Sequence, residues 1–177
     1  MEKIIVVIMH GITPKDFPQE EKREYMKLRA KYHDTEVNSE HAQSVRFHEL
    51  EAKIRNWPRN QQNDPFFVAS EKLGKDLEEV TGSKVLVGFN EFCAPSASHV
   101  LTEATHQGAK EVIVTTPMLT RGGHHSEEEI PELIQDAQER HPETTFRYAW
   151  PFDSLQIARF LAAHIEKFEK AGIHKLN

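Results

Sequence analysis

Short runs of aliphatic and β-branched residues constrain the fold of this chain more than any other feature. Lys3 to Met9 (KIIVVIM), Ser83 to Phe89 (SKVLVGF) and Val112 to Thr116 (VIVTT) are mostly apolar. Such runs are typical of strands that are covered on both faces, as in parallel sheets. Thr144 to Trp150 is a fourth predicted strand.

Helical patterns separate these runs. Caps and 3.6-residue periodicity predict helices from Asp64-Pro65 to Gly82, from Pro95 to Gly108, from about Ile130, and from Asp153 or Ser154 to Gly172. The stripes expected to be buried are Phe66, Leu73, Leu77 and Val80; Ala97, Val100, Leu101 and Ala104; Ile130, Leu133, Ile134 and Ala137; and Ile157, Phe160, Leu161, Ile165 and Phe168.

Strands that alternate with helices predict an α/β fold, because parallel strands need right-handed crossovers that place helices on both faces of the sheet. The 177 residues are expected to form one domain, residues 1–177. We predict a three-layer sandwich around a four-stranded parallel sheet of strand order 2-1-3-4, as in flavodoxin-like folds.

Residues 19–64 do not fit this alternation and are predicted to form an inserted helical hairpin. The strongly charged segment Gln19 to Tyr32 is its first helix. The second is capped by Asn38 or Ser39, ends at Pro58, and carries a stripe of Phe47, Leu50, Ile54 and Trp57. The hairpin is interpreted either as a packing element with a solvated face or as a lid or dimer contact.

Charge and hydropathy argue against several classes of protein. A net charge of −6 and a pI of about 6.0 argue against a nucleic-acid partner. No apolar run approaches the roughly 20 residues of a membrane span, and the apolar N-terminus is too short for a signal peptide. A single cysteine, Cys93, excludes an internal disulfide and favours a reducing cytoplasm.

Potential metal ligands follow three of the predicted strands. His10 comes after the first strand, Glu91 after the second, and His124 and His125 after the third. The strand order 2-1-3-4 brings these carboxyl ends together at the edge where ligands bind. Two imidazoles and a carboxylate suit a divalent metal such as cobalt, iron, nickel or zinc. The spacing alone leaves metal binding and ordinary structural roles open, since no HExxH, CxxC, GxSxG or phosphate-loop motif occurs.

Three blocks of sequence carry a resemblance to a known family. They are Met9-His10-Gly11, FNEFCAPS at Phe89 to Ser96, and GAKEVIVTTPMLTRGGHHSEEEIPE at Gly108 to Glu132, followed by the HPETTFRYAWP strand. Together they resemble the CbiX family, the small class II sirohydrochlorin chelatases of cobalamin and sirohaem biosynthesis. The resemblance covers residues 1–11 and roughly 84–170.

The resemblance implies a lyase that inserts a divalent metal (cobalt, iron or nickel) into a tetrapyrrole without ATP or another nucleotide. It implies that His10, His125 and Glu91 bind the metal and act in catalysis. His125 is preferred to His124 because His125 keeps the family's spacing to Ile130-Pro131. The resemblance also implies a homodimer.

Sirohydrochlorin carries many carboxylates, whereas this chain is net negative, so local groups must attract the substrate. Arg121 and Lys15 are the candidate cations, and Gly122 and Gly123 are expected to let backbone approach the ligand closely.

Two other functions are considered. The first loop, HGITPKDFP, and the hairpin favour a non-catalytic metal or tetrapyrrole carrier on the same fold. A phosphate-handling enzyme that uses His10 would require a second basic cluster at the strand ends, where the sequence supplies only Arg121.

Overall fold

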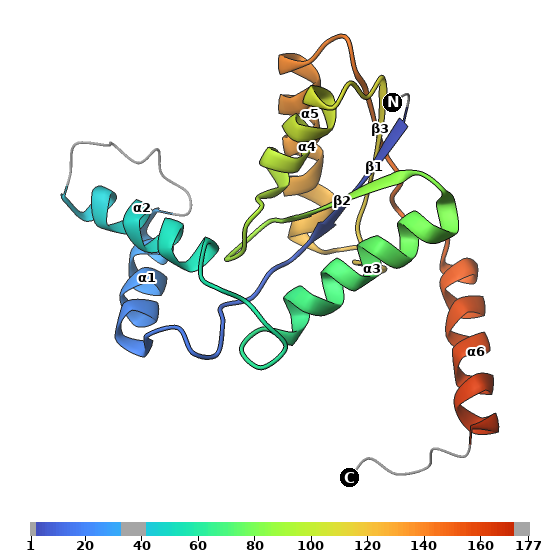
Figure 1. Ribbon diagram of the computed structural model, residues 1–177, viewed down its shortest axis with the longest axis horizontal. Coiled ribbons are helices and arrows are strands. Elements are labelled where there is room, and N and C mark those ends of the chain that lie inside the picture. Colours follow the sequence, from blue (N-terminus) through green and yellow to red (C-terminus); the bar gives the residue numbers. More distant parts are fainter. Residues whose placement is uncertain (1–2, 33–41, 172–177) are drawn as a thin grey trace.

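The computed structural model describes residues 3–32 and 42–171, and its centre is a four-stranded parallel sheet (Figure 1). The strands are β1 (Lys3–Met9), β2 (Lys84–Phe89), β3 (Glu111–Thr115) and β4 (Thr145–Tyr148), in the order β2-β1-β3-β4. In the centre of the sheet, Val6 pairs with Leu86 on one side and with Val114 on the other. The predicted strand order and directions are confirmed.

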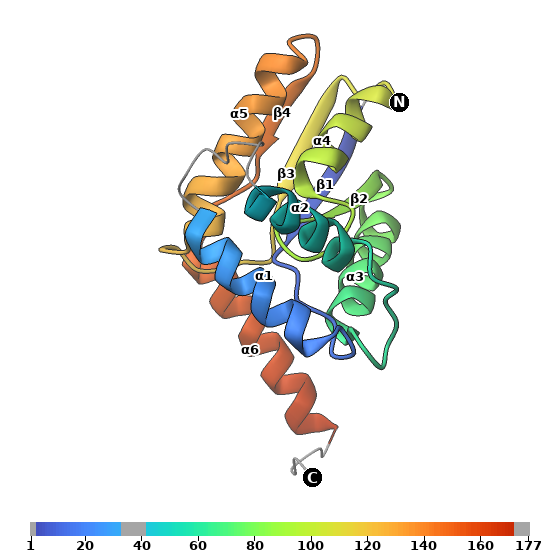
Figure 2. The same ribbon diagram turned by 90° about the vertical axis from the view of Figure 1, so that its left-hand side faces the viewer.

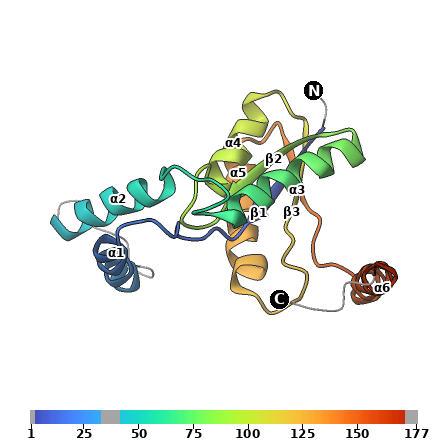
Figure 3. The same ribbon diagram turned by 60° about the horizontal axis from the view of Figure 1, so that its bottom comes forward.

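Six α-helices surround or extend this sheet within the described residues. They are α1 (Gln19–Tyr32), α2 (Ala42–Arg55), α3 (Pro65–Thr81), α4 (Ala97–His106), α5 (Ile130–Arg140) and α6 (Ser154–Lys170). Helices α4 and α5 pack on one face of the sheet, and α3 packs on β2 from the other (Figure 3). No helix in the described part of the chain is long and apolar enough to cross a bilayer.

Local sequence signals explain where these helices begin and end. The Asp64 side chain accepts a hydrogen bond from the backbone N–H of Phe67, and Gly82 ends α3 in the left-handed conformation. The helix predicted to open at Pro95 begins two residues later, because Ser96 is its N-cap. Asp153 caps α6, as one of the two predicted alternatives, and Gly172 lies outside the described residues.

The main core lies between the sheet and the helices α4 and α5. Its buried members include Ile4, Val6, Ile8, Val112, Val114, Val100, Leu101, Ala104, Ile130 and Ala137. A second core on the other face joins Val7, Met9 and Phe89 to Phe66 and Leu77 of α3. The predicted α3 stripe is wrong at two positions, because Leu73 and Val80 are 42% and 84% exposed.

Helix α6 differs most from its prediction. Its stripe of Ile157, Phe160, Leu161, Ile165 and Phe168 was expected to be buried, but no α6 residue is buried. Figures 1 and 3 show the helix standing apart from the sheet and its covering helices. The periodicity correctly predicts an amphipathic helix; it does not specify a neighbour for the apolar face.

The inserted hairpin has a small core of its own. Helices α1 and α2 pack side by side (Figure 2) around Tyr25, Leu50 and Ile54, which also contact Phe17 and Phe92. The predicted caps Asn38 and Ser39 lie outside the described residues, and the helix α2 ends at Arg55, before Trp57 and Pro58. The hairpin is therefore packed against the loop that follows β2 through Phe92.

Candidate metal site

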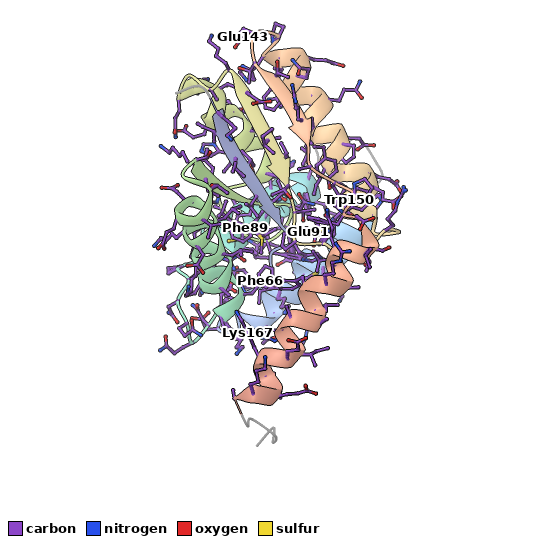
Figure 4. The ribbon with its side chains drawn as sticks, turned by 90° about the vertical axis from the view of Figure 1, so that its right-hand side faces the viewer. Phe66, Phe89, Glu91, Glu143, Trp150 and Lys167 are labelled. Atoms are coloured by element: carbon purple, nitrogen blue, oxygen red, sulfur yellow. The ribbon has the colours of Figure 1, made fainter. Side chains whose placement is uncertain are left out.

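Three predicted ligands from three segments meet beyond the carboxyl edge of the sheet, where the strands end. Nitrogen or oxygen atoms of His10, Glu91 and His125 all lie within 4.8 Å of one another. His10 Nε2 is 3.8 Å from Glu91 Oε2, and His125 Nε2 is 3.8 Å from Glu91 Oε1. Figure 4 shows Glu91 just past the tips of the strand arrows.

The backbone after β2 places Glu91 beside His10. The N–H of Asn90 donates to the carbonyl of Met9, and the N–H of Glu91 donates to the carbonyl of His10, both at 2.9 Å. These bonds extend the β1–β2 ladder past the end of both strands. Gly11 has a φ of 94°, and a Cβ there would lie 1.9 Å from the carbonyl oxygen of Glu91, so this close approach requires glycine.

A π-helical turn places His125. The turn covers His125–Glu129, and the N–H of Ile130 closes it by donating to the carbonyl of His125. The Ser126 hydroxyl donates to the carbonyl of Gly123, and no side chain caps the turn. π-Helical turns occur frequently at functional sites.

Hydrogen bonds orient both imidazoles so that Nε2 faces the carboxylate. Nδ1 of His10 lies 2.6 Å from the carbonyl oxygen of Gly11, and Nδ1 of His125 lies 2.6 Å from Oε2 of Glu129. Both partners only accept, so each Nδ1 carries the proton and a neutral ring has its lone pair on Nε2. Two lone pairs and a carboxylate therefore point at one small volume.

The spacing of these atoms is close to that of a coordination shell. Imidazole nitrogen and carboxylate oxygen bind zinc-like metals at about 2.1 Å, so tetrahedral ligand atoms are roughly 3.4 Å apart. The separations of 3.8 Å to 4.8 Å require movements of about 1 Å or less. Three protein ligands would leave an open position for a substrate.

An arginine from the hairpin forms hydrogen bonds with the Glu91 carboxylate. The two terminal nitrogens of the Arg29 guanidinium donate to Glu91, one to each oxygen, with the Nη1–Oε2 bond at 3.2 Å. The guanidinium also lies 4.8 Å from the ring centre of Phe92, which has a strained positive φ of 54°. Arg29 thus provides the positive charge next to the ligand cluster.

The charges shift both partners of this pair toward their ionised forms. Burial raises the pKa of Glu91, but the hydrogen bond and charge of Arg29, together with His10 and His125, bring it below its usual value. Burial lowers the pKa of Arg29, and Glu91 more than offsets that effect. Glu91 is therefore held as an anion, paired with Arg29, beside the two imidazoles.

The other predicted binding residues are more dispersed. Arg121 is 70% exposed and pairs with Glu127, whose carboxylate also accepts from the N–H of Gly122. Gly123 precedes the π-helical turn and accepts from Ser126. Lys15 lines a different cavity, together with Asp16 and Asn63, that contains none of the three converging residues.

His124 does not belong to the converging group. Its Nδ1 and Nε2 atoms each lie 3.2 Å from a carboxylate oxygen, of Glu128 and Glu129 respectively. Because Glu129 contacts both histidines, it links His124 to His125.

Reasoning from the sequence did not predict two residues of the site, Glu129 and Arg29. Glu129 had a detectable signal, because it is four residues after His125 and such positions share one helical face. Arg29 had none: it lies 62 residues from Glu91 among many charges of α1.

A polar cavity of about 150 Å³, lined by Arg29, Glu91, Glu129 and Tyr25 among others, lies between the hairpin and the cluster.

Comparisons with known proteins agree with this architecture. A crystal structure from Marinobacter aquaeolei VT8, described as a cobalamin (vitamin B12) biosynthesis CbiX protein, aligns with a TM-score of 0.58 at 15% identity and covers 98% of this chain and 100% of that one. No curated protein sequence matches.

Two structures of SirB from Bacillus subtilis are also similar. The sirohydrochlorin chelatase SirB of subspecies spizizenii in complex with cobalt aligns at 18% identity, and SirB with Fe³⁺ at 17%, both with a TM-score of 0.43. They cover 85% of this chain, which spans 44% and 40% of theirs. Their lower TM-scores mean that the fold assignment depends on the Marinobacter structure.

The family model for CbiX matches residues 60–167, which include Glu91, His125 and the strands β2 to β4. His10 and the hairpin precede the matched segment. Because the match spans well over half of the sequence, this chain belongs to the CbiX family.

Proposed function

We propose that this protein is a lyase that inserts a divalent metal (cobalt, iron or nickel) into sirohydrochlorin or a related tetrapyrrole, in cobalamin or sirohaem biosynthesis, as a homodimer in the cytoplasm. The observation that carries the proposal is the convergence of His10 Nε2, His125 Nε2 and the Glu91 carboxylate. Family membership supports the same chemistry.

The donor set explains how the metal would be bound and released. The three donors match metals of intermediate softness and complete only part of a coordination shell. A flat macrocycle that approaches the open side offers four ring nitrogens and replaces the protein ligands as the metal enters. The metal gives up Nε2 and carboxylate bonds and gains ring-nitrogen bonds, while two pyrrole N–H protons leave.

The vacated protein ligands are suitable proton acceptors. Each imidazole regains a free Nε2 lone pair when the metal leaves, and imidazole has a reference pKa of about 6.5. Glu129 accepts from Nδ1 of His125, so it would stabilise the imidazolium that forms. Two protons must be accepted when one divalent cation enters the ring. His10 and His125 can each accept one, or one imidazole and the Glu91 carboxylate can.

Arg121, Gly122 and Gly123 lie on the loop before the π-helical turn and are proposed to receive a substrate carboxylate. Arg121 is exposed and lies 5.7 Å from the ring centre of Trp150. A carboxylate that reaches this loop would compete with Glu127 for Arg121 and for the N–H of Gly122.

A direct assay follows the absorbance change of sirohydrochlorin with cobalt(II) or iron(II) between pH 6 and 8, under anaerobic conditions. We expect acceleration over the spontaneous reaction and its loss in the His10→Ala, His125→Ala and Glu91→Gln variants. His106→Ala on α4 is the matched control, since this histidine packs near His141, outside the cluster, and should keep full activity. Full activity in His125→Ala would overturn the assigned site.

The hairpin favours one second candidate, a metal or tetrapyrrole carrier without turnover. Arg29 pairs with Glu91, and the cavity between the hairpin and the ligand cluster is too small for a macrocycle, so these features favour a metal rather than a tetrapyrrole as the carried ligand. Calorimetry with cobalt(II), read together with the absorbance assay, distinguishes the two functions: both bind the metal through His10 and His125, but only the lyase accelerates insertion.

A further inference from the structure

The guanidinium beside the ligand cluster comes from outside the segment that matches the family. Arg29 belongs to the hairpin helix α1, whereas the family match begins at residue 60. Among the described residues, its hydrogen bonds go only to Glu91, and 22% of its side chain remains exposed. The charge of Arg29 therefore depends on an anion that is itself a predicted metal ligand.

A metal ion and Arg29 would compete for the same carboxylate. Arg29 donates to both oxygens of Glu91, a geometry that makes arginine–carboxylate pairs strong. A divalent cation that binds between Glu91 and the two imidazoles takes up carboxylate oxygen and repels the guanidinium. Metal loading would therefore leave Arg29 without an anion in a partly buried place, where an unpaired charge is costly.

The cavity between the hairpin and the cluster has room for a replacement anion. Its volume is about 150 Å³, and Arg29, Arg55, Glu91 and Glu129 are among the residues that line it. Arg55 is already held by Glu51 and by two backbone carbonyls, so Arg29 is the guanidinium that can change partner. The cavity suits a carboxylate on a short chain, and a ring attached to that chain would lie beside the cluster.

An aromatic ring keeps the guanidinium at the cavity when its anion changes. The Arg29 guanidinium lies 4.8 Å from the ring centre of Phe92, within the range of a cation–π contact. Phe92 is buried in the hairpin core, where it also contacts Tyr25. The position of this ring does not depend on the pairing of Glu91, so Arg29 stays near the cavity in either state.

We propose that this cavity is a carboxylate site for the tetrapyrrole, and that Arg29 changes partner from Glu91 to a substrate carboxylate when the metal binds. The identity of the substrate rests on the proposed function. In the metal-free protein the Arg29–Glu91 pair blocks the site, which lowers the apparent affinity for the tetrapyrrole. Metal frees Arg29 for the tetrapyrrole, and by linkage the tetrapyrrole frees Glu91 for the metal.

Binding of sirohydrochlorin without metal, followed by its absorbance, tests the exchange in the absence of turnover. Glu91→Gln removes the competing anion and should tighten sirohydrochlorin binding by about tenfold. The same substitution in an Arg29→Gln background should give no gain. An equal gain in both backgrounds would show that Glu91 merely repels the substrate, and no gain in either would show that Arg29 does not bind it; each result would reject the exchange.

Arg46→Gln is the matched control on the same hairpin. Arg46 pairs with Glu24, and neither residue lines the cavity. Combined with Glu91→Gln, it should leave the roughly tenfold gain intact. If the control also removed the gain, the effect would belong to hairpin packing rather than to the charge of Arg29, and the proposal would be wrong.

The insertion assay separates this inference from the proposed function. At saturating cobalt(II), Arg29→Gln should raise the KM for sirohydrochlorin by about tenfold and change kcat by less than about threefold. An unchanged KM would contradict the exchange and leave the lyase in place. A wild-type protein that accelerates no insertion would reject the proposed function instead, and the metal-free binding measurements would still decide whether Arg29 binds a carboxylate.

Discussion

The α1–α2 hairpin and α6 are both helical extensions of the sheet, yet they are held in opposite ways. The hairpin is rich in charge, but it has a buried core around Leu50 and Ile54 and reaches the candidate site through Arg29. Helix α6 is richer in large apolar residues and buries none of them. Apolar content therefore shows which surface needs a partner, and tertiary contacts decide whether the same chain supplies it.

Anchoring explains the difference. The side chain of Arg59, which follows α2, is 3% exposed and pairs with Asp64, and it also donates to the carbonyls of Ile12 and Ile54. Arg55 at the end of α2 donates to the carbonyls of Asn90 and Cys93. These bonds join the hairpin to the loops after β1 and β2. The described residues provide α6 with one such anchor, Trp150, at its entrance.

The largest expected effect in this comparison is the loss of the buried ion pair. Arg59→Met should lower the free energy of unfolding by about 3–5 kcal/mol, because Asp64 would remain buried without its charged partner. Lys72→Met is the control, since the Lys72–Asp76 pair is exposed and should contribute less than about 0.5 kcal/mol. Urea denaturation measures both; equal effects would mean that the buried Arg59–Asp64 pair stabilises the protein no more than an exposed pair.

Truncation of matched leucines compares the two regions directly. Leu50→Ala should destabilise the protein by about 2–5 kcal/mol, because it opens a cavity in the hairpin core. Leu161→Ala on α6 should change stability by less than about 0.5 kcal/mol when the protein is dilute enough to be monomeric. A large effect of Leu161→Ala under those conditions would mean that α6 packs on its own chain.

Replacing Arg29 by a neutral residue tests how the hairpin influences metal binding at the site. Arg29→Gln should tighten cobalt(II) binding by about tenfold, since the guanidinium competes with the metal for Glu91 and repels it. Arg46→Gln removes a hairpin arginine that pairs with Glu24 instead, and should leave affinity unchanged. Calorimetry on both variants gives the answer, and weaker binding in Arg29→Gln would show that Arg29 positions Glu91 rather than competing for it.

The smallest expected effects concern the rate of alkylation of Cys93, which measures how tightly the hairpin is packed against the loop after β2. Cys93 is buried, and burial raises the pKa of its thiol to about 12, so it should resist alkylation at pH 8. Arg59→Met should accelerate the labelling, because Arg59 donates to the carbonyl of Phe92, the residue before Cys93, and its loss loosens this loop. Leu161→Glu should cause no change. Equal acceleration in both variants would indicate general unfolding instead of hairpin opening.

Much of the fold could be predicted because its signals are local. The strands, the caps at Asp64 and Asp153, and the stripe on α4 depend on periodicity and on side chains within a few residues, and the strand order follows from the alternation of strands with helices. The failures at Leu73, Val80 and α6 share one cause: periodicity identifies an apolar face, while exposure depends on which other element lies next to it.

The sequence by itself determined the strands, the parallel topology, and the positions of His10, Glu91 and His125 at strand ends, because strand patterns are local and their alternation with helices requires parallel crossovers. Only the tertiary structure decided that Arg29 occupies Glu91, that Glu129 orients His125, and that α6 stands free. Those outcomes depend on contacts between distant segments, whose geometry is a property of the whole packed chain.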